Sequence, residues 1–253
     1  ENTSLVIPST VTHFAGPSTF KGQKNLVSIT IPDSIEIIFN QCFDGCENLR
    51  EVTLSEGLQT IGREAFRNCY NLEKIAFPSS LAHLNVASFK NCSQLTTVIL
   101  PDDIKLKSVT TGVFYNCTNL SEINIPDGVE IIYDDVFTYC KSLTSLSLPD
   151  SVTEFDMNSI CHTSITHFVW PKNVRPIYMY EPKYKDGCPL NYLVIQKGTK
   201  YLQYAQFFLY DNLDTFYFEG TEEEFKEIEI DITFALIQFV MSVMGIWFAV
   251  VLF

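Results

Sequence analysis

A block of 23 residues recurs along this chain, and this recurrence constrains the fold more than any other feature. Residues 119–141, NLSEINIPDGVEIIYDDVFTYCK, show it most clearly, with apolar residues at positions 2, 5, 7, 11, 14, 18 and 19, Pro at 8 and Cys at 22. The pattern fits residues 25–47, 48–70 and 71–93 without a gap, and residues 94–118 with two additional residues after Ile104. Such self-similarity predicts a solenoid of stacked coils. Function must then come from a surface that several coils share.

The pattern within one coil predicts where its side chains lie. In the segment L-x-x-I-x-I, positions 5 and 7 face one way and positions 4 and 6 the other, as in a strand with one buried face. Position 8, usually Pro, ends the strand in a turn. Positions 11 and 14 indicate a short return segment on the far side, and a small-then-aromatic pair follows at positions 18 and 19. We expect neighbouring coils to close the core together, with Phe66 stacked on Phe89.

The blocks L-x-x-I-x-I-P and A-F-x-x-C-x-x-L, as in NLREVTL with REAFRNCYNL, resemble the leucine-rich repeats of the BspA-like surface proteins. This family occurs in mucosal bacteria and protozoan parasites, and the resemblance covers roughly residues 5 to 225. It implies an α/β leucine-rich-repeat solenoid with a parallel β-sheet on one face. It also implies a cell-surface or secreted module that binds proteins, often as an adhesin.

The repeat phase divides the chain into an ectodomain over residues 1–230 and an apolar segment over 231–253. The predicted repeats are 2–24, 25–47, 48–70, 71–93, 94–118, 119–141, 142–163 and 164–189, followed by a C-terminal cap at 190–230. Ile7-Pro8 aligns with Ile31-Pro32, whereas Asn2 stands where Leu26 would be. The chain therefore begins inside a repeat, and we expect further coils and a signal peptide upstream.

Residues 232–253 carry no charge, and as a helix they would be about 33 Å long, which matches a bilayer core of about 30 Å. We expect a transmembrane helix, with the repeats extracellular on a single-pass surface protein. A tail anchor and a cleaved signal for a lipid anchor are the alternatives. Thr221 with Glu224 predicts a capping box at the start of a short helix before it.

Composition excludes several function classes. The net charge of -13 argues against a general nucleic-acid surface, which would need basic stripes. Five of the eight cysteines follow the repeat, with spacings of 23, 23, 25 and 23 residues, so we expect buried, reduced thiols and not metal ligands. Cys161 and Cys188 fall where the repeat degenerates and are either free or joined in a disulfide. We expect no catalytic residue, metal or cofactor.

The leading hypothesis is a surface protein that recognises a host cell-surface or matrix protein through the outward strand residues. The alternative is a structural or antigenically variable coat protein without a specific ligand. The candidate binding residues are Arg50, Glu51, Thr53, Glu73, Lys74, Thr97, Ile99, Glu122, Asn124, Ser145 and His167. A second candidate patch is Tyr178, Tyr180 and Tyr184 in the irregular insertion 176–189, which otherwise serves as part of a terminal cap. Candidate glycosylation sites are Asn2, Asn91, Asn116 and Asn119.

Overall fold

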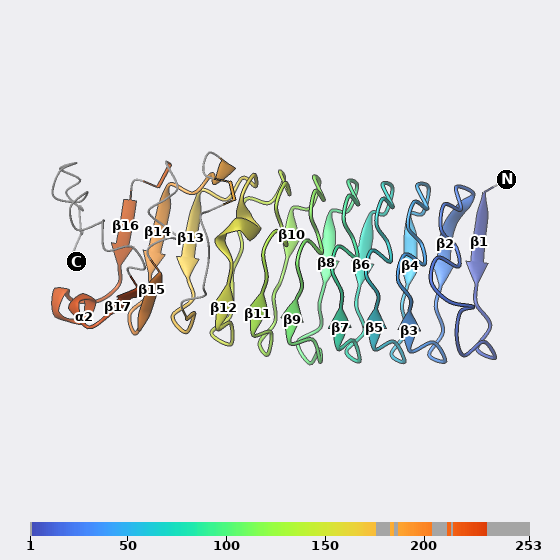
Figure 1. Ribbon diagram of the computed structural model, residues 1–253, viewed down its shortest axis with the longest axis horizontal. Coiled ribbons are helices and arrows are strands. Elements are labelled where there is room, and N and C mark those ends of the chain that lie inside the picture. Colours follow the sequence, from blue (N-terminus) through green and yellow to red (C-terminus); the bar gives the residue numbers. More distant parts are fainter. Residues whose placement is uncertain (1, 176–182, 185–186, 204–211, 214, 232–253) are drawn as a thin grey trace.

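The chain stacks its coils into an elongated solenoid (Figure 1). The computed structural model describes residues 2–175, 183–184, 187–203, 212–213 and 215–231. Strand β1 (Thr3–Val6) lies at one end of the array and helix α2 (Glu222–Lys226) at the other. The solenoid that the repeat period predicts is confirmed.

The strands predicted from the L-x-x-I-x-I segment form a parallel sheet. Glu51 lies opposite Lys74, and Lys74 lies opposite Thr97, so each residue pairs with its equivalent in the next coil. Position 5 faces the core, where Ile29 and Ile75 are buried. The order of the six strands is β1, β2 (Leu26–Thr30), β4 (Glu51–Thr53), β6 (Lys74–Ala76), β8 (Thr97–Ile99) and β10 (Glu122–Ile123).

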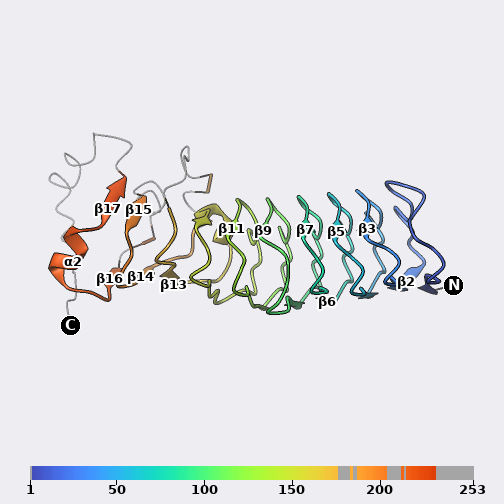
Figure 2. The same cartoon turned by 90° about the horizontal axis from the view of Figure 1, so that it is seen from below.

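The return segments of the coils between residues 25 and 163 are strands as well, so these coils contain two parallel sheets and little helix, and the expected α/β class is not confirmed. Figure 2 shows the two sheets on separate sides of the coils. The turn at position 8 closes tightly, as in the bond from the Ile35 N–H to the Pro32 carbonyl, and leaves too few residues for a return helix. The second sheet contains β3 (Ile37–Ile38), β5 (Thr60–Ile61), β7 (His83–Leu84), β9 (Ser108–Val109), β11 (Ile131–Ile132) and β12 (Glu154–Phe155).

Positions 16 to 22 form a corner that leads from the second sheet back to the first. Its phenylalanines stack from coil to coil, and the predicted contact of Phe66 with Phe89 is confirmed at 5.0 Å between ring centroids. The cysteine at position 22 is buried in each coil and donates its S–H to a carbonyl of the preceding coil, as Cys92 does to Phe66. All eight cysteines lie in the described part of the chain, are buried and form no disulfide, which confirms the prediction of buried, reduced thiols for the repeat cysteines.

The corner backbone adopts the left-handed conformation twice in each coil. At position 17, Glu64 and Ala87 have φ of 55° and 56°, and at position 21, Asn68 and Asn91 have φ of 62° and 66°. Asn tolerates this conformation better than most residues, which accounts for its recurrence at position 21. The resulting turns direct corner N–H groups at the carbonyls of the next coil, as in Phe66 to Ser88.

The coils after residue 142 are irregular but continue the stack. The corner of the coil 142–163 contains a 3-10 helix, η1 (Met157–Ile160). A third parallel sheet contains β13 (His167–Trp170), β14 (Tyr192–Ile195) and β16 (Thr215–Phe218). Beside it, β15 (Tyr201–Gln203) pairs with β17 (Glu229–Asp231). The capping box predicted at Thr221 and Glu224 is present at the start of α2.

Residues 232–253, where a transmembrane helix is predicted, lie outside the described residues. Within the described ranges, no helix combines the length and apolarity needed to cross a bilayer. The membrane helix therefore stays a prediction from the sequence.

Candidate binding surface

The first sheet presents two exposed rows of side chains, which we call the strand face. One row holds position 4, where Glu51, Lys74 and Glu122 are exposed and Thr97 is half-buried. Neighbouring parallel strands lie about 4.8 Å apart, so the opposite charges of Glu51 and Lys74 lie close together, and Thr97 separates Lys74 from Glu122. All these side chains are held in register by the sheet, and a partner would meet a preformed surface.

The second row of the strand face holds position 6 and contains its apolar residues. Ile99 is 40% exposed and lies in register with Ala76 of β6. Thr53 and Asn124 occupy the same position in their coils and are also exposed. An exposed isoleucine within a polar surface can contribute apolar contact area to an interface.

The strand face does not extend as one sheet to His167. Residues 143–149 carry no strand, so the sheet that ends at β10 is separate from the sheet that begins at β13. The break lies in coil 142–163, which is one residue shorter than the repeat. Ser145 is exposed within the break, and the ring of His167 stacks on Tyr192 of β14 at 5.1 Å. The remaining predicted positions, Arg50 and Glu73, are exposed beside the first sheet.

The alternative tyrosine patch falls only partly within the described chain. Tyr178 and Tyr180 lie outside the described residues. Tyr184 is half-buried and packs edge-on against Tyr139 and His162, whose rings stack on each other at 4.3 Å between centroids. Its ring is therefore engaged in the corner of the solenoid.

At three of the candidate glycosylation sites the side-chain amide nitrogen donates a hydrogen bond to another coil. Asn2 is exposed. The Nδ2 of Asn91 donates to Asn68, at 2.8 Å, and the Nδ2 of Asn116 donates to Asn91, at 3.0 Å. Asn119 donates to Gln94 at 3.2 Å. A glycan on Asn91 or Asn116 would replace a bond that joins two coils.

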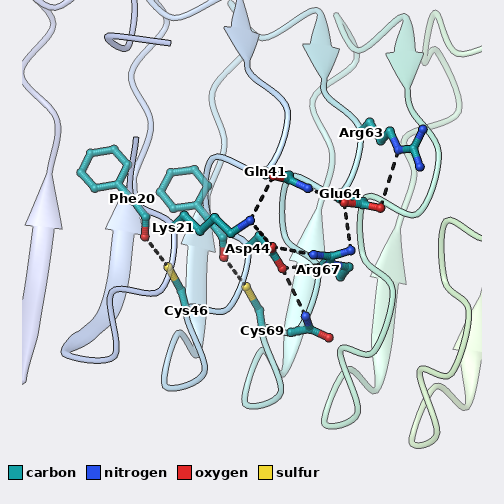
Figure 3. Close-up of polar contacts among 11 residues, drawn as sticks. Phe20, Lys21, Gln41, Asp44, Cys46, Arg63, Glu64, Arg67 and Cys69 are labelled. Atoms are coloured by element: carbon teal, nitrogen blue, oxygen red, sulfur yellow. Dashed lines mark hydrogen bonds and ion pairs between the residues drawn. The ribbon is translucent and has the colours of Figure 1, made fainter. Parts of the chain in front are cut away.

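The sequence pattern missed a charged network at the corner of the first complete coils (Figure 3). The Asp44 carboxylate, with 4% of its side chain exposed, accepts from Arg67 Nε at 3.0 Å and a terminal guanidinium nitrogen at 2.8 Å. Lys21 Nζ lies 3.1 Å from the same carboxylate. Burial opposes ionisation of Asp44, but the hydrogen bonds and charges of Arg67 and Lys21 outweigh it and lower its pKa. The 23-residue offset of Asp44 and Arg67 was the available signal.

The thiols of the corner are poor nucleophiles. Burial raises the pKa of Cys46 to about 11 and that of Cys42 to about 12. Burial also raises the pKa of Cys69, Cys92 and Cys140 well above the usual range. A protonated, enclosed thiol neither attacks a substrate nor binds a metal readily, so the geometry favours a packing role for this row.

The solved structures to which the chain is similar include bacterial leucine-rich repeat proteins. The chain is 25% identical to a leucine-rich repeat protein from Bacteroides ovatus, with a TM-score of 0.68. The match covers 90% of this chain and 60% of that one. A leucine-rich repeat protein from Eubacterium ventriosum is 20% identical, with a TM-score of 0.55, over 70% of this chain and 61% of that one. The chain thus spans less than two thirds of the length of either protein. No curated protein matches it.

The sequence also matches the family model for the BspA type leucine-rich repeat region. The match comprises 6 copies over residues 13–110, 69–185 and 107–231, which together include most of the chain. The matched span contains every strand of the two six-stranded sheets except β1, and it contains all of the corner cysteines. The chain therefore belongs to the BspA-type leucine-rich repeat family.

Proposed function

We propose that this chain is the recognition part of a cell-surface protein, and that its strand face binds a host cell-surface or matrix protein. The observation that carries the proposal is the pair of exposed rows in register on the first sheet, with Ile99 amid polar side chains. Parallel pairing over six strands fixes these side chains before a partner arrives, and preorganisation of this kind reduces the entropic cost of binding.

The chemistry of the strand face favours a moderate interaction. Its central residues are hydroxyls and charges of both signs, and it lacks the Trp and Tyr side chains that usually dominate interface energies. Many copies on one cell surface would then supply avidity without further contacts. Residues 232–253 would act as the membrane anchor and hold these copies at the surface.

The second candidate function is a coat protein whose repeats bind no specific ligand. A pull-down with the full-length chain from host-cell extracts and purified matrix proteins, followed by saturation binding, separates the two. A specific receptor predicts saturable capture of a defined protein. Capture without saturation would support the coat function.

Variants of the strand face locate the contact. Ile99→Asp combined with Thr97→Lys is expected to abolish capture, because it places two charges at the centre of the face. Ile37→Asp is the matched control, since Ile37 is 42% exposed on the second sheet and Ile99 is 40% exposed on the first. If the double variant still captures the partner while Tyr178→Ala with Tyr180→Ala does not, the insertion and not the strand face is the binding site.

A further inference from the structure

The corner of the solenoid contains a groove that neither the repeat pattern nor the family assigns. It encloses about 340 Å³ and runs across four successive coils, from Arg63 and Glu64 to Asp135 and Tyr184. It lies on the corner, at positions 16, 17 and 20, so it is distinct from the strand face. We call it the corner groove.

The corner groove is hollow because of the residues at position 17. Successive coils place Glu64, Ala87, Gly112 and Asp135 there, all with left-handed φ between 55° and 64°. The two central residues, Ala87 and Gly112, have little or no side chain, so the surface is hollow between the carboxylates of Glu64 and Asp135. Position 20 forms one wall with Arg67, Lys90 and Tyr115, and position 16 forms the other with Arg63, Val86 and Thr111.

The charge of the groove is opposite to that of the chain as a whole. Its lining holds four cationic side chains, those of Arg63, Arg67, Lys90 and Lys183, against two carboxylates, while the chain carries a net charge of -13. Both carboxylates are paired, Glu64 with Arg63 and Arg67, and Asp135 with Lys183. Arg67 and Lys183 also pair with Asp44 and Asp134 outside the lining, so the cation that remains for a ligand lies between the two ends.

Lys90 is the cation available for a ligand. Its Nζ lies 4.5 Å from the centroid of the Tyr115 ring, above the wall of the groove. Among the described residues, no carboxylate forms an ion pair with it, whereas the other three cations of the groove are paired. The half-buried Lys90 is held by an aromatic face, which leaves its three N–H donors free to contact an anion.

We propose that the corner groove binds a short, extended acidic segment of a partner protein, with one carboxylate side chain above Ala87 and Gly112 and in contact with Lys90. Three coil steps of about 4.8 Å give about 14 Å between Glu64 and Asp135, which matches about four extended residues. The exposed side chain of Val86 provides an apolar surface for the methylenes of a glutamate. This inference goes beyond the strand-face function, because it concerns another side of the coil.

Fluorescence anisotropy with a labelled decapeptide of alternating Glu and Ser tests the proposal on the full-length chain in non-ionic detergent. We expect saturable binding that weakens as NaCl is raised, and none for a decapeptide of alternating Gln and Ser. Lys90→Glu is expected to weaken binding at least about tenfold. Lys105→Glu, the same charge change at an exposed residue outside the groove, is expected to have little effect.

A second variant fills the hollow. A side chain at Gly112 would meet only the Tyr115 Cβ, at 3.7 Å, and Asp135 shows that aspartate adopts this backbone conformation at the same position. Gly112→Asp should therefore fold and lose the peptide. Ile99→Asp on the strand face should keep it, so the two proposals can fail separately.

Three outcomes would overturn the inference. Equal binding of the Glu and Gln peptides would exclude recognition of carboxylates. Equal effects of Lys90→Glu and Lys105→Glu, or an undiminished affinity in Gly112→Asp, would exclude the corner groove. If a heparin-derived hexasaccharide binds more tightly and displaces the peptide, the ligand of the groove is a sulfated glycan and not an acidic protein segment.

Discussion

The coils of residues 25–141 and the coils after residue 142 close their cores in different ways. In the first region, like packs on like: Phe43, Phe66, Phe89, Phe114 and Phe137 stack at centroid distances of 5.0 to 6.0 Å. In the second region, Phe155 still stacks on Phe168, but the ring of Trp170 packs edge-on against both. The comparison teaches that repetition is one route to a closed solenoid core and that local complementarity is another.

The backbone of the corner bridges both regions. In the regular coils its N–H groups bond to carbonyls of the next coil at constant spacing, and the same row continues from Tyr139 to Cys161 and from His162 to Gly187. Gly187 thus takes the corner position of the following coil. The side-chain pattern differs after residue 142, but the backbone N–H groups of each corner still need carbonyl acceptors in the next coil.

The largest expected effect is in the middle of the phenylalanine stack. Phe66→Ala should destabilise the protein by about 3–5 kcal/mol, because Phe66 is fully buried between Phe43 and Phe89. Urea denaturation followed by circular dichroism measures the change. Tyr70→Ala in the same coil is the control, since Tyr70 is 42% exposed. Equal effects of the two variants would contradict the stacked core.

Glycine substitutions compare how rigidly the two regions are packed. An added Cβ at Gly57 would lie 1.7 Å from the Asp33 carbonyl oxygen, whereas one at Gly187 would lie 2.3 Å from the His162 ring. Of the two glycine substitutions, Gly57→Ala should destabilise the protein more, because a backbone carbonyl of the regular coils cannot rotate aside. Gly187→Ala should cost about 1–3 kcal/mol.

The double variant His162→Ala with Gly187→Ala tests the explanation for Gly187. The double variant should be less destabilised than the sum of the two single effects, because the ring that an added Cβ at Gly187 would contact is gone. Thermal melting of the four proteins gives the coupling. A strictly additive result would mean that His162 does not limit this position.

A carboxylate whose cations lie on the neighbouring regular coils should matter more than one whose cation lies on a later coil. Asp44 is held by both Arg67 and Lys21, whereas Asp135 is paired with Lys183, whose side chain is 52% exposed. Asp44→Asn should therefore cost about 2 kcal/mol, and more than Asp135→Asn. Because folding lowers the pKa of Asp44, its contribution is present above the unfolded value of about 3.9 and is lost as pH falls through the folded value.

Denaturation at several pH values measures the contribution of the Asp44 carboxylate to the free energy of unfolding. Wild-type protein and Asp44→Asn should differ most near neutral pH and converge as the pH falls below about 4. A difference that stays constant well below that pH, through the folded pKa of Asp44, would show that the Asp44 charge is not what stabilises the corner.

The smallest expected effect is a difference in thiol reactivity. Cys161 and Cys188 lie in the irregular coils, and the hydrogen bond from Cys161 lowers the pKa of Cys188, whereas burial raises the pKa of Cys69 and Cys92. In low urea, Cys161 and Cys188 should react with maleimide several-fold sooner than Cys69 and Cys92. Peptide mass spectrometry gives the order. Simultaneous labelling would indicate that both regions open together, and a blocked pair would identify a disulfide.

The amino-acid sequence by itself determined the solenoid, the length of its coils, the buried positions and the rows of Phe and Cys. It did so because each coil repeats the same apolar pattern, and a strand with alternating side chains has only one face to bury. The exposure of Ile99 and Glu51 follows from the same alternation.

Only the tertiary structure decided the second sheet, the break of the first sheet near Ser145, the network around Asp44 and the corner groove. These features depend on contacts between residues one coil apart and on the left-handed backbone at positions 17 and 21. Residues as different as Glu64, Ala87 and Gly112 share that backbone, so their residue types do not reveal it. The stacking of coils imposes it, because the N–H groups of each corner must meet the carbonyls of the next.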